Sequence, residues 1–330
     1  MLANARTATP DLFRSHPRRW GVILAGGDGS RLLPLTRQVV GDDRPKQFCA
    51  LIDDETLLRQ TRQRISSLVS PERTLVVLTK THERYFEGNL DGVPLQHQLI
   101  QPSNRDTAPA ILYSLLRVRE ADPQAVVAFF PSDHYFADDA PFVEHVDAAF
   151  AAVEARPESL LLLGVVPDTP ETGYGWIEPG DLLCDQWPGP ICRISQFWEK
   201  PSHEFALDLM GRGCLWNSFV MVCHVGTLLS LIRHMLPRLY DAFESIRSSF
   251  LTMAEDGALS RLYSAIRPAN FSHEVLSSHP YDSVHPCVLS VMRGANLGWS
   301  DLGEPGRVLS AIERKGAQSE RLQWAVATAG

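Results

Sequence analysis

Short continuous apolar runs alternate with segments of helical periodicity along the first half of the chain. The runs at 20–24, 75–78 and 125–130 are rich in Val, Leu, Ile and Phe, the pattern of strands buried on both faces. Between them, the segments at 55–69 and 110–119 place apolar residues at helical spacing, and a more polar helix is expected at about 82–90. Strands that alternate with helices in this way predict a parallel, doubly wound sheet.

From residue 160 the hydrophobic pattern becomes less regular. Another buried run, 160–166, is followed by segments at 173–179 and 191–198 that predict sheet with irregular connections. Residues 225–266 have the pattern of continuous helix. We therefore expect the second half to extend the sheet and to line a substrate pocket with polar groups at its strand ends.

The first buried run leads into a glycine-rich turn, Gly26-Gly27-Asp28-Gly29, and then into a segment that begins at Ser30, a candidate helix cap. Glycines allow backbone N–H groups to approach a phosphate closely, and the N-terminal end of a following helix adds positive charge. Arg31 and Lys46 supply two cations within reach of the same site. The alternative is a plain turn between a strand and a helix with an incidental arginine.

This turn differs from two known phosphate motifs. A P-loop requires Gly-x4-Gly-Lys followed by Ser or Thr, which is absent here, and Leu32 replaces the third glycine of the dinucleotide fingerprint. The turn therefore favours a phosphate group without the signature of a Walker-type site or of an NAD site.

A carboxylate follows the buried run at 125–130, in the segment Pro131-Ser132-Asp133-His134. In doubly wound sheets ligands bind outside the carboxyl ends of the strands, so Asp133 is expected near the phosphate pocket. A carboxylate beside phosphates is explained by a bound Mg²⁺, which prefers one or two carboxylates together with substrate phosphates. The alternative is an aspartate that caps the next element. Nothing in the sequence requires His134 for proton transfer.

Composition and charge limit the partners of the chain. Its 330 residues are 44% hydrophobic and 21% charged, as in ordinary globular proteins, and the formal net charge is −8 at pH 7. Such an acidic chain argues against nucleic acid as the main partner. The six cysteines form no Cys-x-x-Cys pair, which favours reduced thiols in the cytoplasm.

The run at 160–166 is far shorter than the roughly 20 residues that cross a bilayer, and the N-terminal segment lacks the apolar core of a secretory signal. We expect a cytoplasmic protein with neither a nucleic-acid nor a membrane partner.

Eight sequence blocks, in the same order, resemble the sugar-1-phosphate nucleotidylyltransferases, and within them the mannose-1-phosphate guanylyltransferases. The blocks are LAGGDGSRL (24–32), RPKQF (44–48), NRDTAPA (104–110), PSDH (131–134), GYGWIE (173–178), FWEKP (197–201), LWNS (215–218) and WSDLG (299–303). Each block alone is modest evidence, but eight blocks in order identify the family.

The resemblance implies a fold and a domain organisation. The expected fold is an α/β, Rossmann-like nucleotidyltransferase fold with a mostly parallel mixed sheet flanked by helices. We expect a flexible leader at 1–18, a single nucleotidyltransferase domain at 19–312 and a tail at 313–330. Within the domain, we expect a nucleotide half at about 19–158 and a sugar-binding half at about 159–312. Only residues 304–330 follow the last block, so we expect no C-terminal β-helix. The segments at 308–314 and 321–326 have a helical pattern and are expected to dock on the core or on a second copy of the chain, as in a homodimer.

The resemblance also implies an activity. Members of the family join a nucleoside triphosphate to a sugar-1-phosphate and release pyrophosphate, with Mg²⁺ as the cofactor; GTP and mannose-1-phosphate are the expected substrates. The near alternative is the same chemistry with another nucleoside triphosphate or hexose-1-phosphate, and the distant alternative is a catalytically silent subunit that senses a nucleotide sugar. The acceptor phosphate is ionised at neutral pH, so its oxygen can attack the α-phosphorus in line without a general base. Two like unit charges about 4 Å apart repel by about 4 kcal/mol at an effective dielectric of about 20, so cations are required.

Candidate site residues follow from matching the blocks position by position. The nucleotide-binding candidates are Leu24, Ala25, Gly26, Gly27, Gly29, Ser30, Arg31, Lys46, Asn104, Arg105, Thr107, Ala108, Pro131 and Ser132. The candidates for binding the sugar phosphate are Gly175, Glu178, Glu199, Lys200 and Asn217. The metal candidates are Asp133 and Asp301, and the candidates for catalysis are Arg31, Lys46, Asp133 and Lys200.

Two local features depart from the family pattern. Phe219 stands where the family usually has glycine after Trp-Asn-Ser, and this change is expected to reshape the sugar pocket. The segment Gly41-Asp42-Asp43 makes the loop before Lys46 longer and more acidic, which is unusual beside a triphosphate.

Overall fold

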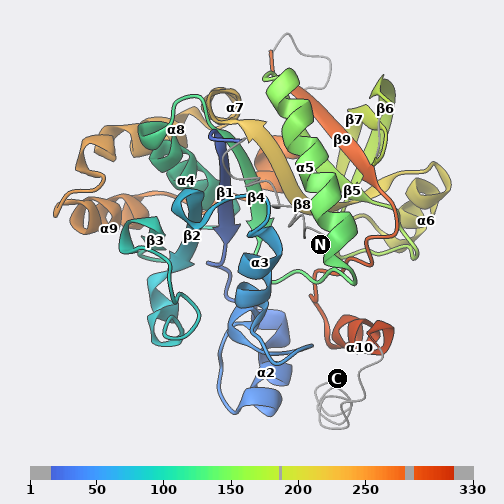
Figure 1. Cartoon of the computed structure of the whole chain (residues 1–330), viewed down its shortest axis with the longest axis horizontal. Helices are drawn as coiled ribbons and strands as arrows, with labels where there is room; N and C mark the ends of the chain where they lie inside the picture. Colours follow the sequence, from blue (N-terminus) through green and yellow to red (C-terminus); the bar gives the residue numbers. More distant parts are fainter. Residues whose placement is uncertain (1–15, 186–187, 279–285, 316–330) are drawn as a thin grey trace, which may run out of the picture.

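Four parallel strands form one half of the sheet (Figure 1). They are β1 (Arg19–Leu24), β2 (Thr74–Thr79), β3 (Gln98–Gln101) and β4 (Val126–Pro131), in the order β3-β2-β1-β4. The computed structural model describes residues 16–185, 188–278 and 286–315. Val22 and Phe129 face one apolar cluster while their neighbours Ile23 and Phe130 face the other, which explains why these strands appear in the sequence as unbroken apolar runs.

The second half of the chain makes the sheet mixed. It adds β5 (Ser159–Val165), β6 (Gly175–Cys184), β7 (Ile191–Glu199), β8 (Leu215–His224) and β9 (Val288–Gly294), which gives the order β3-β2-β1-β4-β8-β5-β9-β7-β6. Among the strands in the described ranges, only β7 and β8 run against the others. The expected mostly parallel mixed sheet is therefore confirmed, and the parallel arrangement predicted from the apolar runs of the first half is confirmed for β1 to β4.

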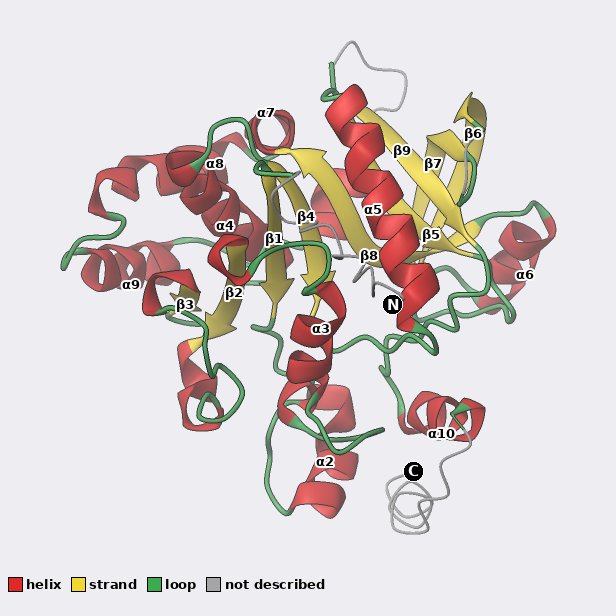
Figure 2. Ribbon diagram, in the orientation of Figure 1, coloured by secondary structure: helices red, strands yellow, loops and turns green. Residues whose placement is uncertain are grey.

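Helices cover both faces of the sheet (Figure 2). One face carries α4 (Thr107–Ala121), α7 (Val225–Met235), α8 (Pro237–Ile246) and α9 (Glu255–Ala265), and the other carries α3 (Leu57–Ile65), α5 (Asp139–Ala155) and α6 (His203–Gly211). The predicted continuous helix at 225–266 is wrong, because Leu236 leaves the helical conformation, Pro237 begins a new helix, and a 3-10 turn and loop separate α8 from α9.

A third apolar cluster lies beyond the carboxyl ends of β1 and β4. It joins α10 (Pro305–Arg314) to the segment after the glycine turn, through contacts among Leu32, Leu35, Tyr135, Val308 and Ile312. That segment begins as a single 3-10 turn, Ser30–Leu32, before α2 (Leu33–Val40), and Ser30 is the first residue of the turn rather than its cap. Figure 1 shows α2 and α10 together below the arrowheads of β1 and β4.

The ends of the chain are described only in part. The predicted helix at 308–314 is confirmed by α10, whereas the predicted helix at 321–326, most of the leader and most of the tail lie outside the described residues. Within those residues, no β-helix follows the sheet, as expected. None of the helices described here combines the length and the apolar character that a membrane crossing requires.

Candidate active site

A cavity of about 760 Å³ lies at the carboxyl ends of β1 and β4 and extends to β6 and β8. Its wall includes a large part of the residues that the sequence singled out. These are Leu24, Gly26, Gly27, Ser30, Arg31, Asn104, Thr107, Pro131, Ser132, Asp133, Gly175, Glu199, Lys200, Asn217 and Asp301. The structure thus brings the candidate nucleotide, sugar and metal positions to one cavity, as expected for a sheet of this kind.

Six other candidates lie outside the cavity wall. They are Ala25, Gly29, Lys46, Arg105, Ala108 and Glu178. Ala25 and Ala108 are buried, and Arg105 donates through Nε to the carbonyl oxygen of Tyr263 at 2.8 Å. Glu178 forms an ion pair with Arg212, which does not line the cavity either. These positions are therefore more suited to support of the wall than to direct contact with a substrate.

Close contacts brace the glycine turn. A Cβ atom added to Gly26 would lie 2.8 Å from Thr79 Oγ1 and 2.9 Å from Gln101 Nε2, so only glycine fits without a shift. Gln47 Nε2 donates to the carbonyl oxygens of Ala25 at 3.1 Å and Gly27 at 2.7 Å. The turn is thus fixed before any phosphate binds.

The acidic loop before Lys46 has partners of its own. Arg44 Nε donates to Asp42 Oδ1 at 2.8 Å, and Arg37 Nη2 lies 2.6 Å from Asp43 Oδ1. Each acidic side chain is neutralised by an arginine close to it in sequence, which accounts for two carboxylates near a phosphate site.

Lys46 lies behind the cavity wall with its ammonium group directed at the candidate metal ligands. Its side chain is 9% exposed, and Nζ lies 3.1 Å from Asp133 Oδ2. The same ammonium donates to the backbone carbonyl oxygens of Asp301 and Leu302, the latter at 3.3 Å. One cation therefore joins the segment after β4 to the segment after β9.

Asp301 is held by groups from three parts of the chain. Its Oδ1 accepts from Arg307 Nη1 at 2.7 Å and from the backbone N–H of Gly303 at 2.8 Å, and its Oδ2 lies 3.9 Å from Arg31 Nη2. Burial opposes ionisation of this carboxyl, but Lys46 and Arg307 outweigh that effect and lower the pKa of Asp301 below its ordinary value. Asp301 is thus an ionised carboxylate at neutral pH.

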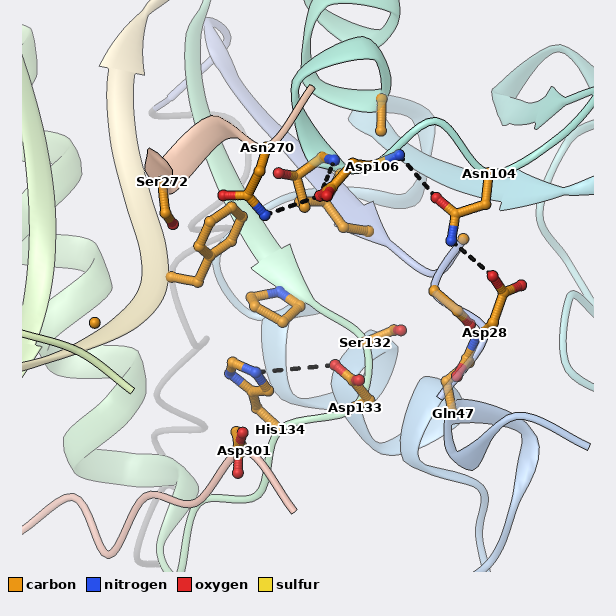
Figure 3. A pocket seen from close by; sticks show the side chains of 18 of the residues that line it. Asp28, Gln47, Asn104, Asp106, Ser132, Asp133, His134, Asn270, Ser272 and Asp301 are labelled. Atoms are coloured by element: carbon orange, nitrogen blue, oxygen red, sulfur yellow. Dashed lines mark hydrogen bonds and ion pairs between the residues drawn. The ribbon is translucent and has the colours of Figure 1, made fainter. Parts of the chain in front are cut away.

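His134 lies beneath Asp133 and is oriented by Trp299. Trp299 Nε1 donates to His134 Nδ1 at 3.2 Å, and the two rings meet edge to face with centroids 5.3 Å apart. Because Nδ1 accepts, the proton of the neutral ring is on Nε2, which lies 3.9 Å from Asp133 Oδ1 (Figure 3). Burial lowers the pKa of His134, so the ring is uncharged at neutral pH.

The candidate metal ligands are of a kind that could hold Mg²⁺. Asp133 and Asp301 supply two carboxylates to one cavity, and Mg²⁺ prefers one or two carboxylates with substrate phosphates completing its coordination. The described ranges contain no group of three or more Asp, Glu, His or Cys side chains that could hold a metal ion alone. A metal ion here would therefore depend on the phosphates of a bound substrate.

The candidate acceptor side is formed by the ends of β6, β7 and β8. Lys200 is 59% exposed, and its Nζ lies 3.4 Å from Glu199 Oε1. A Cβ atom on Gly175 would lie 2.7 Å from Phe197 Cζ, so glycine is needed there. Phe219 lines the cavity with φ at 59°, in the left-handed region that favours glycine.

Several wall residues carried no assigned role at the level of sequence. Asp28, Gln47 and Asp106 lie inside the recognised blocks, and Asp28 pairs with Asn104 Nδ2 at 2.8 Å and with His82 Nε2 at 3.1 Å. The segment Pro268–Ser272, by contrast, has no local signal. It reaches the cavity through Asn270, whose Nδ2 donates to Asp106 Oδ1 at 3.0 Å (Figure 3).

The chain is similar to known nucleotidyl transferases in sequence and in structure. The family model described as nucleotidyl transferase matches residues 20–316. The chain is 30% identical over 292 residues to mannose-1-phosphate guanylyltransferase of Escherichia coli strain K12, which covers 86% of this chain and 57% of that protein. It is 30% identical over 306 residues to the xanthan biosynthesis protein XanB of Xanthomonas campestris pv. campestris strain B100, which covers 89% of this chain and 60% of that protein.

The chain therefore spans about three fifths of the length of these two relatives. Among solved structures, it superposes with a TM-score of 0.75 and 29% identity on the crystal structure of mannose-1-phosphate geranyltransferase from Thermus thermophilus. The match covers 92% of this chain and 80% of the other.

Proposed function

The chain belongs to the nucleotidyl transferase family, and we propose that it transfers a nucleotidyl group from a nucleoside triphosphate to a sugar-1-phosphate. GTP and mannose-1-phosphate are the substrates we favour, because relatives named mannose-1-phosphate guanylyltransferase are similar over most of this chain. The observation that carries the proposal is the single cavity that joins the glycine turn to Asp133, Asp301 and Lys200.

The glycine turn and Arg31 suit the triphosphate. The turn exposes backbone N–H groups at the end of β1, and the side chain of Arg31 is 57% exposed at the cavity. Lys200 also lines the cavity and offers a second exposed cation, to the acceptor phosphate. Two cations in one cavity offset the repulsion between the two phosphates as they approach each other.

The transfer step needs no protein nucleophile. An oxygen of the sugar phosphate bonds to the α-phosphorus, the bond from that phosphorus to the oxygen bridging to the β-phosphorus breaks, and pyrophosphate leaves with the electron pair. His134 is largely enclosed and uncharged, and its Nε2 lies 3.9 Å from Asp133 Oδ1, beyond hydrogen-bond distance, so no proton transfer is assigned to it.

Asp133 and Asp301 would hold Mg²⁺, which when bound would neutralise phosphate charge between donor and acceptor. Lys46 then keeps Asp133 in place from behind, and Arg307 does the same for Asp301. Magnesium, a cytoplasmic location and a homodimer are all parts of this proposal.

A screen of substrates tests the proposal. The purified full chain is mixed with each of the common nucleoside triphosphates, a set of hexose-1-phosphates and Mg²⁺, and pyrophosphate release is followed. We expect the highest kcat/KM with GTP and mannose-1-phosphate. Failure of every pair to release pyrophosphate above a protein-free control would reject the proposal, and a better pair would replace the favoured substrates.

Asp133→Asn separates an enzyme from a silent sensor of nucleotide sugars. For an enzyme, loss of one charge-stabilising group is expected to lower kcat by about 10²–10³. A sensor would show no turnover in either form and would still be stabilised by a nucleotide sugar in a thermal unfolding assay. The enzyme is favoured because Arg31, Asp133, Lys200 and Asp301 line one cavity and Lys46 supports Asp133 from behind its wall, and a sensor has no need of that full set.

A further inference from the structure

Arg307, in the first turn of α10, bridges two sides of the cavity. Its Nη1 donates to Asp301 Oδ1 at 2.7 Å, and its Nη2 donates to Glu171 Oε2 at 2.6 Å. Asp301 follows β9, whereas Glu171 precedes β6 in the loop that carries Tyr174 and Gly175 to the acceptor side. A single guanidinium thus connects the metal side of the cavity to its acceptor side.

The surroundings of Arg307 are fitted to this bridge. The side chain is 11% exposed, and its guanidinium carbon lies 4.2 Å from the centre of the Tyr174 ring, within the range of a cation–π contact. A Cβ atom on Gly173 would lie 2.8 Å from Arg307 Nη2, so the loop approaches the guanidinium as closely as glycine permits. The planar fork of arginine suits two carboxylates at once, which a lysine cannot match.

The bridge determines which oxygen of Asp301 remains for a metal ion. Oδ1 accepts from both Arg307 and the backbone N–H of Gly303, whereas Oδ2 is directed toward Arg31 at 3.9 Å. Arg307 therefore fixes the rotation of the carboxylate and presents Oδ2 to the cavity. Groups that orient a metal ligand in this way commonly change metal affinity or activity by about 10–100-fold when they are removed.

Attachment of α10 does not require this arginine. Val308, Ala311 and Ile312 are buried in the cluster that contains Leu32 and Leu35, and they hold the helix on the domain. A charged side chain that hydrogen-bonds Asp301 and Glu171, lies 3.7 Å from Glu304 Oε1 and contacts the ring of Tyr174 therefore needs another explanation.

We infer that Arg307 is a positioning residue that aligns Asp301 and the Glu171–Tyr174 loop, so that α10 forms part of the active site. The inference rests on the proposed transferase function and deepens it. Arg307 positions both the metal side and the acceptor side of the cavity, and it touches neither substrate.

The test compares Arg307→Ala, Arg307→Lys and the control Arg314→Ala in the full chain. Arg314 lies on the same helix, is 44% exposed and pairs only distantly, at 3.4 Å, with Asp168. For Arg307→Ala we expect the KM for Mg²⁺ and the KM for the sugar-1-phosphate each to rise by about tenfold, with the KM for the nucleotide unchanged. For Arg307→Lys we expect the Mg²⁺ dependence to recover, because one ammonium can still pair with Asp301, while the acceptor KM stays high because Glu171 is not reached.

A purely structural role would move a different set of quantities. It would lower the unfolding temperature and kcat in both Arg307 variants and leave both KM values equal to those of Arg314→Ala, which would overturn the inference. A second readout does not require turnover, namely the rise in unfolding temperature that mannose-1-phosphate alone produces in each protein. If the unaltered chain shows this rise in unfolding temperature but no turnover, the proposed function fails. In that case, a rise of equal size in Arg307→Ala overturns the inference, and a smaller rise supports it. If the unaltered chain shows neither turnover nor a rise, both fail.

Discussion

Lys46 Nζ lies 3.1 Å from Asp133 Oδ2, although one residue precedes α3 and the other follows β4. The pair is mostly enclosed, with side-chain exposures of 9% and 27%. The ammonium also reaches the carbonyl oxygens of Asp301 and Leu302. The candidate metal ligands are therefore assembled around a protein cation before any substrate is present. Removal of this cation is predicted to change both kcat and the KM for Mg²⁺.

Replacement of Lys46 by Gln is expected to lower kcat by about 10²–10³, because it removes the cation that holds Asp133 and the Asp301 segment beside the cavity. The change also leaves Asp133 without its cation, so we expect a higher KM for Mg²⁺ as the uncompensated carboxylate loses its orientation. Steady-state kinetics of pyrophosphate release measure both effects. Arg37→Gln is the matched control, since Arg37 is an exposed cation that pairs with Asp43. Equal kinetics for the two variants would show that Lys46 has no special role.

Gly26 and Gly27 offer a matched pair for the glycine turn. Alanine at Gly26 would place its Cβ 2.8 Å from Thr79 Oγ1 and 2.9 Å from Gln101 Nε2, both on buried side chains, whereas a Cβ on Gly27 meets nothing within 4 Å. We expect Gly26→Ala to lower the free energy of unfolding by about 1–3 kcal/mol, the usual cost of an overpacked site, and Gly27→Ala to leave it unchanged. Urea denaturation at neutral pH measures the difference. If both variants are equally stable, the turn can shift without cost.

The sequence predicted the parts of the fold and site that depend on local pattern. The buried runs became β1, β2, β4 and β5, and the glycine turn and Asp133 lie at strand ends where the rule for doubly wound sheets places ligands. The position of Asp301 was available only through the family resemblance. The helix expected at about 82–90 is wrong in type and extent, because a 3-10 helix at 80–85 stands there instead, a difference that apolar spacing does not resolve.

The remaining parts depend on contacts between distant segments. Asn270 donates to Asp106, which lies 164 positions away, and Arg307 donates to Glu171, which lies 136 positions away. The local sequence of neither residue points to its partner. Such residues become visible only when the sheet order brings their segments together.

His224 provides a pH-dependent cap for α7. Its Nδ1 accepts from the backbone N–H of Gly226 at 3.1 Å, and burial, with a smaller contribution from Arg18, lowers the pKa of His224 from its ordinary value of 6.5 against the effect of Asp122. Between the lowered folded value and the unfolded value, only the unfolded chain binds the proton. The free energy of unfolding should therefore fall as the pH falls below about 6.5, since stability rises with pH wherever the unfolded state binds more protons.

The variant His224→Asn isolates this effect, because asparagine is a good helix cap that does not titrate. Other histidines, such as His82 and His97, also have lowered pKa values and act in the same direction, so the comparison between the two proteins is the informative quantity. We expect urea denaturation to show a steeper loss of stability for the unaltered chain between about pH 7.5 and 5.5. If the free energy of unfolding depends on pH equally in the two proteins, protonation of His224 does not cause the loss of stability.

Phe219 allows the cost of its backbone conformation to be separated from the packing of its ring. The φ of 59° favours glycine, while the ring packs edge to face on Phe271 with centroids 6.3 Å apart. Phe219→Gly and Phe219→Ala both remove the ring, but only glycine adopts this φ without strain. We expect the glycine variant to be more stable than the alanine variant by about 1 kcal/mol in urea denaturation. A more stable alanine variant would mean that the backbone relaxes once the ring is gone.

The same two variants should change which acceptors are used. Phe219 lies two positions after Asn217, and both side chains line the cavity, so removal of the ring adds room beside a candidate sugar-binding residue. We expect a bulkier acceptor, N-acetylglucosamine-1-phosphate, to gain in kcat/KM relative to mannose-1-phosphate by about tenfold or more, the scale on which pocket shape discriminates between similar groups. The KM for GTP is the internal control and should stay constant. The ring of Phe219 also contacts Phe271, whose backbone N–H donates to Thr107 Oγ1 at 2.8 Å. If the KM for GTP changes and the ratio of kcat/KM between the two acceptors does not, Phe219 therefore belongs to the nucleotide side of the cavity.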